Sequence, residues 1–169
     1  ESEIASWAWD FGEEGSDSGS IVSKQFSEPG NYEVTLTTID AAGNSASIAA
    51  TIIVNDVTIP DARFTYYYDI DGNGTIEEDE QALQKAMEGM PVIFNASKTE
   101  DNFDSLANLT FNWEFGDGMS ASGAVVEHVY AELRDDGFNV VLTVTDRAGN
   151  ESVFGTLVEP APMVRPDLY

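Results

Sequence analysis

The chain has 169 residues and carries 31 acidic against 7 basic residues, which gives a formal net charge of −24. Such a charge repels nucleic acids and anionic membranes and suits either plain solubility or surroundings rich in salt or calcium. Cysteine is absent, which excludes disulfides, thiol chemistry and cysteine-ligated metals. No apolar run approaches the roughly 20 residues that span a bilayer, so we expect no membrane insertion. The chain starts at Glu1 without a signal-peptide pattern, and we expect it to be a processed or excised piece.

The first element expected is a strand at Trp7-Ala8-Trp9-Asp10-Phe11-Gly12, where aromatic side chains alternate with smaller or polar ones. A loop rich in glycine, serine and acidic residues follows over 13–20. β-branched and aromatic residues then dominate, and no helical period is present. Turn residues separate three further strands, which we expect over 21–26, 32–38 and 48–54, and 56–60 is a short linker.

The next segment carries the residue types of an EF-hand calcium loop at the expected spacing. The loop starts at Asp69, Gly74 occupies the sharp turn at position 6, Ile76 the apolar position 8, and Glu80 the closing position 12. Calcium takes six to eight oxygen ligands, and this spacing makes oxygen atoms converge. We therefore predict calcium as the cofactor of Asp69, Asp71, Asn73, Thr75, Glu77 and Glu80, with Thr75 binding through its carbonyl. The alternative is an acidic surface loop in an acidic protein.

The segments beside this loop differ from a complete EF-hand. Residues 64–68 on the entering side predict a strand instead of a helix, whereas 77–88 predict an exiting helix that Gly89 ends. Pro91–Asn95 is expected to be the next strand. A single half-hand cannot open as a paired sensor does. We therefore expect a structural calcium clip with the weak affinity of extracellular modules.

The second part of the chain repeats the order of the first. Phe111-Asn112-Trp113-Glu114-Phe115 matches the first aromatic strand, and Gly116-Asp117-Gly118 follows it as a turn. Strands are expected again over 125–130 and from Phe138 onward, and Asp146-Arg147-Ala148-Gly149-Asn150 matches the turn at 40–44. The extra residues of the second copy lie in a turn, which is typical of repeated β-domains.

Three motifs of the second copy together resemble the polycystic-kidney-disease-type (PKD) domain. They are Trp113-x-Phe115-Gly116-Asp117-Gly118, His128-x-Tyr130 and Asp146-x-x-Gly-Asn. The resemblance implies an immunoglobulin-like β-sandwich, usually one of several tandem modules in extracellular and cell-surface proteins. The first copy matches less well, because Gly12-Glu13-Glu14 replaces Gly-Asp-Gly and Lys24-Gln25 lies near the histidine position. The regularly spaced short strands favour a sandwich independently of this resemblance.

The fold class expected is all-β, with two tandem immunoglobulin-like β-sandwiches and a calcium loop and short helix inserted in the second. Residues 1–55 form the first sandwich, which is incomplete at its N-terminus because the strands at 61–68 and Pro91–Asn95 have no counterpart before Trp7. The remaining segments are a linker over 56–60 and the second sandwich over 61–159, with its insertion at 69–89. A proline-rich tail over 160–169 is expected to start a further repeat.

Weaker signals leave alternatives open. Asp101, Asn102 and Asp104 form either a second calcium site or, as we favour, a solvated turn. The sequence has one histidine, His128, which excludes multi-histidine zinc sites within the chain. Its place in the His-x-Tyr of the PKD resemblance implies that it is a framework residue. Glycosylation sequons occur at Asn95, Asn108 and Asn150. The aromatic residues Trp7, Trp9, Trp113 and Tyr66 to Tyr68 form either a sugar-stacking platform or, as we favour, core.

The sequence therefore predicts a non-catalytic extracellular or cell-surface module of an adhesion, surface-layer or filament protein, with no catalytic residues. The partners expected are neighbouring copies or domains of the same surface protein and glycans. The tail is expected to be a cut from a longer array or, alternatively, a strand donor that builds a head-to-tail homopolymer. The rival function is an accessory carbohydrate- or substrate-binding module of a secreted hydrolase.

Overall fold

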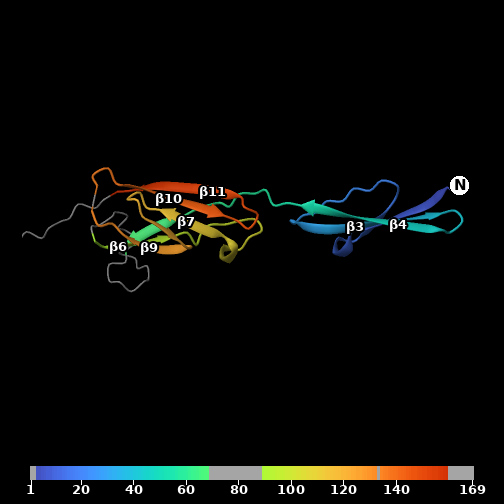
Figure 1. Ribbon diagram of the computed structural model, residues 1–169, viewed down its shortest axis with the longest axis horizontal. Helices are drawn as coiled ribbons and strands as arrows, with labels where there is room; N and C mark the ends of the chain where they lie inside the picture. Colours follow the sequence, from blue (N-terminus) through green and yellow to red (C-terminus); the bar gives the residue numbers. More distant parts are fainter. Residues whose placement is uncertain (1–2, 69–88, 133, 160–169) are drawn as a thin grey trace, which may run out of the picture. The chain divides into compact units, whose positions relative to one another are not determined.

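The computed structural model describes residues 3–68, 89–132 and 134–159, and the chain divides into two compact units after Asp56. In this part of the chain nearly all regular structure is β-strand, and the two helical elements are three-residue 3-10 turns. Figure 1 shows the strands coloured in chain order. The fold class is all-β, as the alternating sequence predicts.

Unit 1 is a single antiparallel sheet with the strand order β2-β1-β3-β4. β-branched and aromatic residues favour extended backbone in its long strands. The hairpin between the two longest strands turns at Gly43, which has a φ of 88° that glycine adopts without strain. The elements are β1 (Ile4–Asp10), η1 (Gly12–Glu14), β2 (Ser16–Ser18), β3 (Gly30–Asp40) and β4 (Ser45–Val54).

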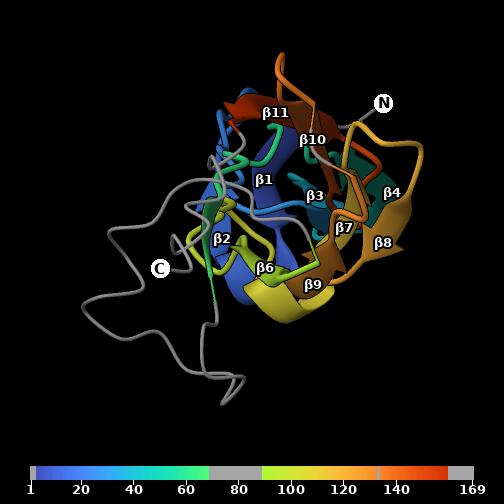
Figure 2. The ribbon, with the colours of Figure 1, turned by 90° about the vertical axis from the view of Figure 1, so that its left-hand side faces the viewer.

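Unit 2 is a sandwich of two antiparallel sheets, with the orders β11-β10-β7-β8 and β5-β6-β9. Figure 2 shows β10 and β11 on one side of the ribbon and β6 and β9 on the other. The elements are β5 (Thr65–Tyr68), β6 (Pro91–Asn95), η2 (Leu106–Asn108), β7 (Thr110–Glu114), β8 (Ser120–Ser122), β9 (Val125–Val129), β10 (Phe138–Thr145) and β11 (Glu151–Val158).

The sheet of unit 1 and the larger sheet of unit 2 have the same register. In each sheet, one row of directly paired residues runs across three strands. The row is Trp9, Leu36 and Ile48 in unit 1, and the equivalent row is Trp113, Leu142 and Phe154 in unit 2. Both tryptophans donate the indole N–H to a glycine carbonyl, over 3.0 Å to Gly19 and 2.8 Å to Gly123. The tandem repeat predicted from the sequence is therefore present in the pairing of the strands.

The core of unit 2 lies between its two sheets. Successive side chains of a strand face opposite sides, so every second residue of β10 points inward. Val140, Leu142 and Val144 are fully buried in this way. They join one cluster with the fully buried Val92 and Phe94 of the facing sheet.

The matching face of unit 1 is only partly covered by the described residues. Trp113 is fully buried, whereas its counterpart Trp9 is half-buried and Ile48 is 70% exposed. Phe11 is the only buried apolar side chain among the described residues of unit 1. The difference follows from topology, because the described strands of unit 1 include no counterpart of β5 and β6.

Two expectations for unit 1 are wrong. The expected strand over 21–26 is irregular, and the expected loop over 13–20 contains η1 and β2. The counterpart of 21–25 in unit 2 is β9, which pairs with β6. A strand needs such a partner for its backbone hydrogen bonds, so the same kind of sequence stays irregular where the partner is missing.

Candidate functional site

The predicted calcium ligands and the predicted helix over 77–88 lie outside the described residues. The ligands in question are Asp69, Asp71, Asn73, Thr75, Glu77 and Glu80. The structure does describe the two ends of this insertion. Tyr68 and Val92 are cross-strand partners in β5 and β6 and are both fully buried, and the Gly89 N–H donates to the Tyr130 carbonyl over 3.0 Å. The residues that flank the insertion are therefore fixed by the pairing of β5 with β6 and by the hydrogen bond to Tyr130.

The second acidic cluster forms a turn. Asp101 Oδ2 accepts hydrogen bonds from the backbone N–H groups of Phe103 and Asp104 over 2.9 and 2.8 Å. Asn102 donates from its side-chain amide to Thr58 Oγ1 over 3.3 Å. Within the described ranges, no three His, Asp or Glu side chains lie together as a metal site would require. The turn was the interpretation that the sequence favoured.

Asp104 ties the loop before β7 to the hairpin of β10 and β11. Its carboxylate is only 5% exposed and accepts hydrogen bonds from the Arg147 backbone N–H over 3.0 Å and from Arg147 Nε over 2.6 Å. Hydrogen bonds between ionised partners are about twice as strong as neutral ones. Sequence reasoning missed this pair, and the one available signal was that Arg147 replaces Ala41 in otherwise matching turns.

An aspartate and an asparagine pin the equivalent hairpin turn in each unit. Asp146 accepts from the Asn150 backbone N–H and from its side-chain amide, both over 2.8 Å. Asp40 accepts from the same two groups of Asn44 over 2.8 and 3.0 Å. Burial opposes the ionisation of Asp146, but hydrogen bonds from Asn150 and nearby backbone N–H groups outweigh it and lower its pKa. The amide of the Asn150 sequon is thus engaged, whereas Asn108 on η2 is exposed.

His128 lies in β9 opposite Val92 and connects this strand to the Gly-Asp-Gly turn. Its Nε2 lies 2.8 Å from Asp117 Oδ2, and its ring stacks on Phe115 with centroids 4.0 Å apart. Asp117 Oδ1 accepts the Met119 N–H over 2.9 Å, which closes the turn. The single histidine therefore has a framework position, as the sequence indicated.

In unit 1 a lysine and a glutamate replace this histidine–aspartate pair. Lys24 Nζ lies 3.2 Å from Glu14 Oε2 and donates to the Glu14 carbonyl over 2.6 Å. The ammonium also lies 5.7 Å from the centroid of the Phe11 ring, within the range of cation–π attraction. Both units therefore connect the turn after the aromatic strand to the following segment by an acid–base pair.

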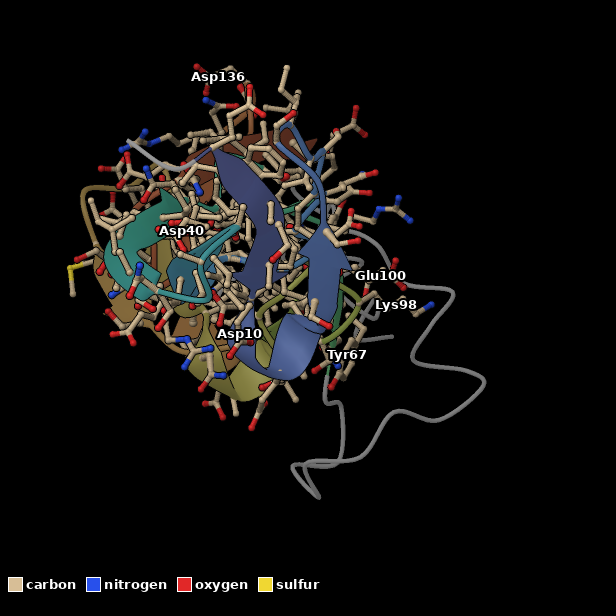
Figure 3. All side chains as sticks on the ribbon, turned by 90° about the vertical axis from the view of Figure 1, so that its right-hand side faces the viewer. Asp10, Asp40, Tyr67, Lys98, Glu100 and Asp136 are labelled. Atoms are coloured by element: carbon tan, nitrogen blue, oxygen red, sulfur yellow. The ribbon has the colours of Figure 1, made fainter. Side chains whose placement is uncertain are left out.

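The described surface of both units is acidic. Figure 3 shows oxygen-tipped side chains pointing outward around the ribbon, with Asp10, Asp40 and Asp136 among those labelled. Few basic side chains interrupt this field, since the whole chain has 7 lysine and arginine residues. Such a surface attracts cations and repels polyanions.

The comparison with known protein families concerns the same aromatic strands and pinned turns. A family model described as the PKD domain matches residues 1–54 and 75–157. The chain belongs to the PKD domain family. The two matched segments include β1 and β7, so the PKD resemblance seen in the sequence is confirmed for both copies.

Two solved structures resemble part of this PKD chain. One comes from work described as the structural basis for the promiscuous specificity of carbohydrate-binding modules from the β-sandwich superfamily. It has a TM-score of 0.47 and 24% identity, over 63% of this chain and 36% of that chain, so this chain spans about a third of its length. The other is the PKD1 domain of Vibrio anguillarum Epp, with a TM-score of 0.40 and 22% identity, over 62% of this chain and 98% of that domain.

Among curated proteins, none matches this PKD chain significantly. In the described parts of both PKD units, no helix has the length and apolar character needed to cross a membrane. The aromatic residues of the second PKD unit are mostly core, because Tyr67, Tyr68 and Trp113 are buried. Trp7 and Trp9 of the first PKD unit are half-buried.

Proposed function

We propose that this PKD chain is a non-catalytic structural module of an extracellular cell-surface, surface-layer or filament protein. The observation that carries the proposal is that its buried polar side chains make hydrogen bonds to the protein's own loops and turns. Within the described ranges these are Thr99, Asp104 and Asp146, and each makes hydrogen bonds that hold a loop or turn in place. Polar groups used in this way support a scaffold.

Family membership and charge support the extracellular location. PKD domains are typical of extracellular proteins, where modules of this kind are repeated along one chain. The net charge of −24 keeps such a chain soluble and separate from polyanions. Neighbouring copies or domains of the same surface protein are the partners that fit this role.

The proposal includes a calcium ion that rigidifies unit 2. Its support is the all-oxygen donor set from Asp69 to Glu80, which matches the preference of calcium. A second support is the pairing of Tyr68 with Val92, which fixes both ends of the loop in the core sheet. A ligand that binds only the folded state raises stability by about 2.7 kcal/mol at a hundredfold excess over Kd.

Thermal melts of the full chain with calcium and with a chelator test this role. We expect a higher Tm for unit 2 with calcium, and we expect Asp69→Ala or Glu80→Gln to abolish the difference. Asp79→Asn is the matched control, because Asp79 occupies loop position 11, which supplies no ligand. Identical melts of the unmodified chain with and without calcium would remove the calcium ion from the proposal.

The non-catalytic role has its own test. We expect the full chain to show no turnover of peptides, glycans or esters, because the sequence has one histidine, no cysteine and no nucleophile–base motif. Turnover that a single carboxylate substitution abolishes would overturn the structural role.

The second candidate function is an accessory carbohydrate-binding module. The observation in its favour is the half-buried pair Trp7 and Trp9 on one face of unit 1. Their register counterparts, Phe111 and Trp113, are buried in unit 2, which favours a core role instead. Affinity electrophoresis on polysaccharides distinguishes the two, since retardation that Trp9→Ala abolishes would assign a glycan to this face.

A further inference from the structure

Unit 2 shows how the aromatic face of this sheet is covered. The cover is the ribbon formed by residues 64–68 and 91–95, which includes β5 and β6. The ring centroid of Phe64 lies 4.9 Å from that of Trp113 and 5.2 Å from that of Phe154. Phe94 lies 5.7 Å from Trp113. Two ribbon phenylalanines thus fill the space above one row of the larger sheet.

Unit 1 has the same row without this cover in the described part of the chain. Trp9 takes the register position of Trp113, and Ile48 takes that of Phe154. Ile48 is 70% exposed, compared with 40% for Phe154. The apolar side chains on this side of the sheet, here called the open face, include Trp7, Trp9, Val34, Leu36, Ile48 and Ile52. Tyr32, the cross-strand partner of Ile52, lies on the same face.

The segment over 21–25 also indicates that unit 1 lacks a described counterpart of the β5–β6 ribbon. Its residues alternate between exposed and half-buried in the same order as those of β9, although it is not a strand. Phe26, just beyond it, stacks on Tyr32 with centroids 4.2 Å apart, so the segment already packs against the sheet. In unit 2 the equivalent strand obtains its ladder from β6, with Val126 opposite Phe94. The segment therefore has the side-chain order of a strand, and no strand among the described residues pairs with it.

We propose that the open face of unit 1 is a docking surface for a two-stranded antiparallel ribbon of the β5–β6 type. Its inner strand pairs antiparallel with 21–25, and a large apolar residue equivalent to Phe94 lies opposite Val22. An aromatic residue equivalent to Phe64 fills the space between Trp9 and Ile48. Docking completes a sandwich like that of unit 2.

The area involved suits a stable interface. Each aromatic residue buries about 150–250 Å², so Phe64, Tyr68 and Phe94 of such a ribbon contribute roughly 450–750 Å². A specific interface buries about 800 Å² on each partner, and the remaining ribbon side chains supply the difference. Backbone hydrogen bonds to 21–25 add the affinity that strand addition provides.

Charge favours this ribbon over a second copy of unit 1. Lys24 is the only basic residue over 1–56, where ten residues are acidic. Two open faces packed together would therefore bring two strongly acidic units into contact. The ribbon of unit 2, over 64–68 and 91–95, contains no charged residue, so a ribbon of this type adds no like charge to the interface.

The test is a fusion to the full chain. A second copy of residues 61–68 is joined through Asn-Gly to a second copy of 92–109, and this segment is placed before Ile4. Asn-Gly forms the two-residue turn that suits the pairing of Tyr68 with Val92. The matched control carries Phe64→Ser and Phe94→Ser in the added copy only.

The readouts are acrylamide quenching of tryptophan fluorescence and hydrogen exchange of the amides of 22–25. Trp113 is already buried, so a change in quenching reports Trp7 and Trp9. We expect quenching to fall severalfold and exchange to slow at least tenfold in the fusion and not in its control. Equal quenching and exchange in both would overturn the proposal.

Two further measurements keep the test independent of the fusion's own folding. The same ribbon added as a synthetic peptide to the unmodified full chain is expected to slow exchange over 22–25, and no effect at saturating peptide would count against docking. Sedimentation of the unmodified chain examines the other occupant. A dimer that Trp9→Lys dissociates would assign the open face to a second copy and overturn the ribbon.

Discussion

His128 Nε2 and Asp117 Oδ2 lie 2.8 Å apart and join β9 to the turn that follows β7. Lys24 and Glu14 form the corresponding pair in unit 1, with 3.2 Å between Nζ and Oε2. The repeat therefore keeps an acid–base connection at this corner while it changes both residue types. The two units therefore present different side chains at an equivalent position, an imidazole ring at His128 and a flexible amine at Lys24.

Asp117→Asn is expected to destabilise unit 2 by about 1–2 kcal/mol at pH 7, because it weakens a charge-assisted hydrogen bond to His128. Urea unfolding followed by NMR signals of each unit measures the change. Glu13→Gln is the matched control in unit 1, since Glu13 is exposed at the register position of Asp117. The control is expected to change the free energy of unfolding by less than about 0.5 kcal/mol.

The same aspartate gives a pH dependence with a definite sign. Burial opposes the ionisation of Asp117, but hydrogen bonds from the Met119 N–H and His128 outweigh it and lower its pKa. A carboxyl with a lowered pKa stabilises the fold above its ordinary value of about 3.9, and this stabilisation disappears as pH falls through the lowered value. The unmodified chain should therefore lose more stability than Asp117→Asn between about pH 5 and pH 2. Parallel stability–pH curves would contradict the assignment.

Arg147→Ala is expected to destabilise unit 2 by about 1–3 kcal/mol, because it removes the side-chain partner of a buried carboxylate. The double variant with Asp104→Ala should cost less than the sum of the two single changes, since the pair acts together. Chemical denaturation of all four proteins gives the coupling energy. A coupling energy of zero would show that Asp104 depends on backbone N–H groups alone.

Leu142→Ala and Leu36→Ala compare a covered with an uncovered sheet. Leu142 is fully buried, and its truncation is expected to cost about 2–5 kcal/mol. Leu36 holds the same register position and is half-buried, so we expect about 1 kcal/mol in unit 1. Unfolding followed separately for each unit checks this difference. Equal losses would mean that the open face is covered in solution.

Gly116→Ala and Gly12→Ala form another matched pair. Both glycines have positive φ, 81° and 66°, but a Cβ on Gly116 would lie 2.8 Å from the Asn139 backbone, whereas Gly12 has open space. Left-handed backbone costs a residue with a side chain about 1–2 kcal/mol, which is the loss expected for Gly12→Ala. Gly116→Ala should lose clearly more, because backbone atoms cannot yield. Thermal melts compare the two, and equal losses would contradict the close approach.

Strong side-chain alternation made much of the fold predictable. Pro91–Asn95 has the predicted bounds, and the strand expected over 32–38 lies within β3. The edge strands Ser16–Ser18 and Ser120–Ser122 were not predicted, because three residues with serine at both ends give no hydrophobic period. The segment over 21–26 was wrongly predicted, because its sequence suits a strand whose partner the described residues of unit 1 do not include.

The site was less predictable than the fold. The calcium ligands Asp69 to Glu80 follow from local spacing, and they remain a prediction because they lie outside the described residues. The pair of Asp104 and Arg147 depends on a contact across 43 positions, which no local pattern reveals. The role of His128 was easier to anticipate, since it lies in the His-x-Tyr pattern that resembles the PKD family.

The pairing of Tyr68 with Val92 also makes unit 2 a scaffold for protein engineering. These two buried residues are cross-strand partners in the core sheet, so a replacement connection between them leaves their register unchanged. Closing a longer connection is inexpensive, because each doubling of loop length costs only about 0.6 kcal/mol. An epitope, a reporter domain or a designed metal-binding loop can therefore be grafted in place of 69–88.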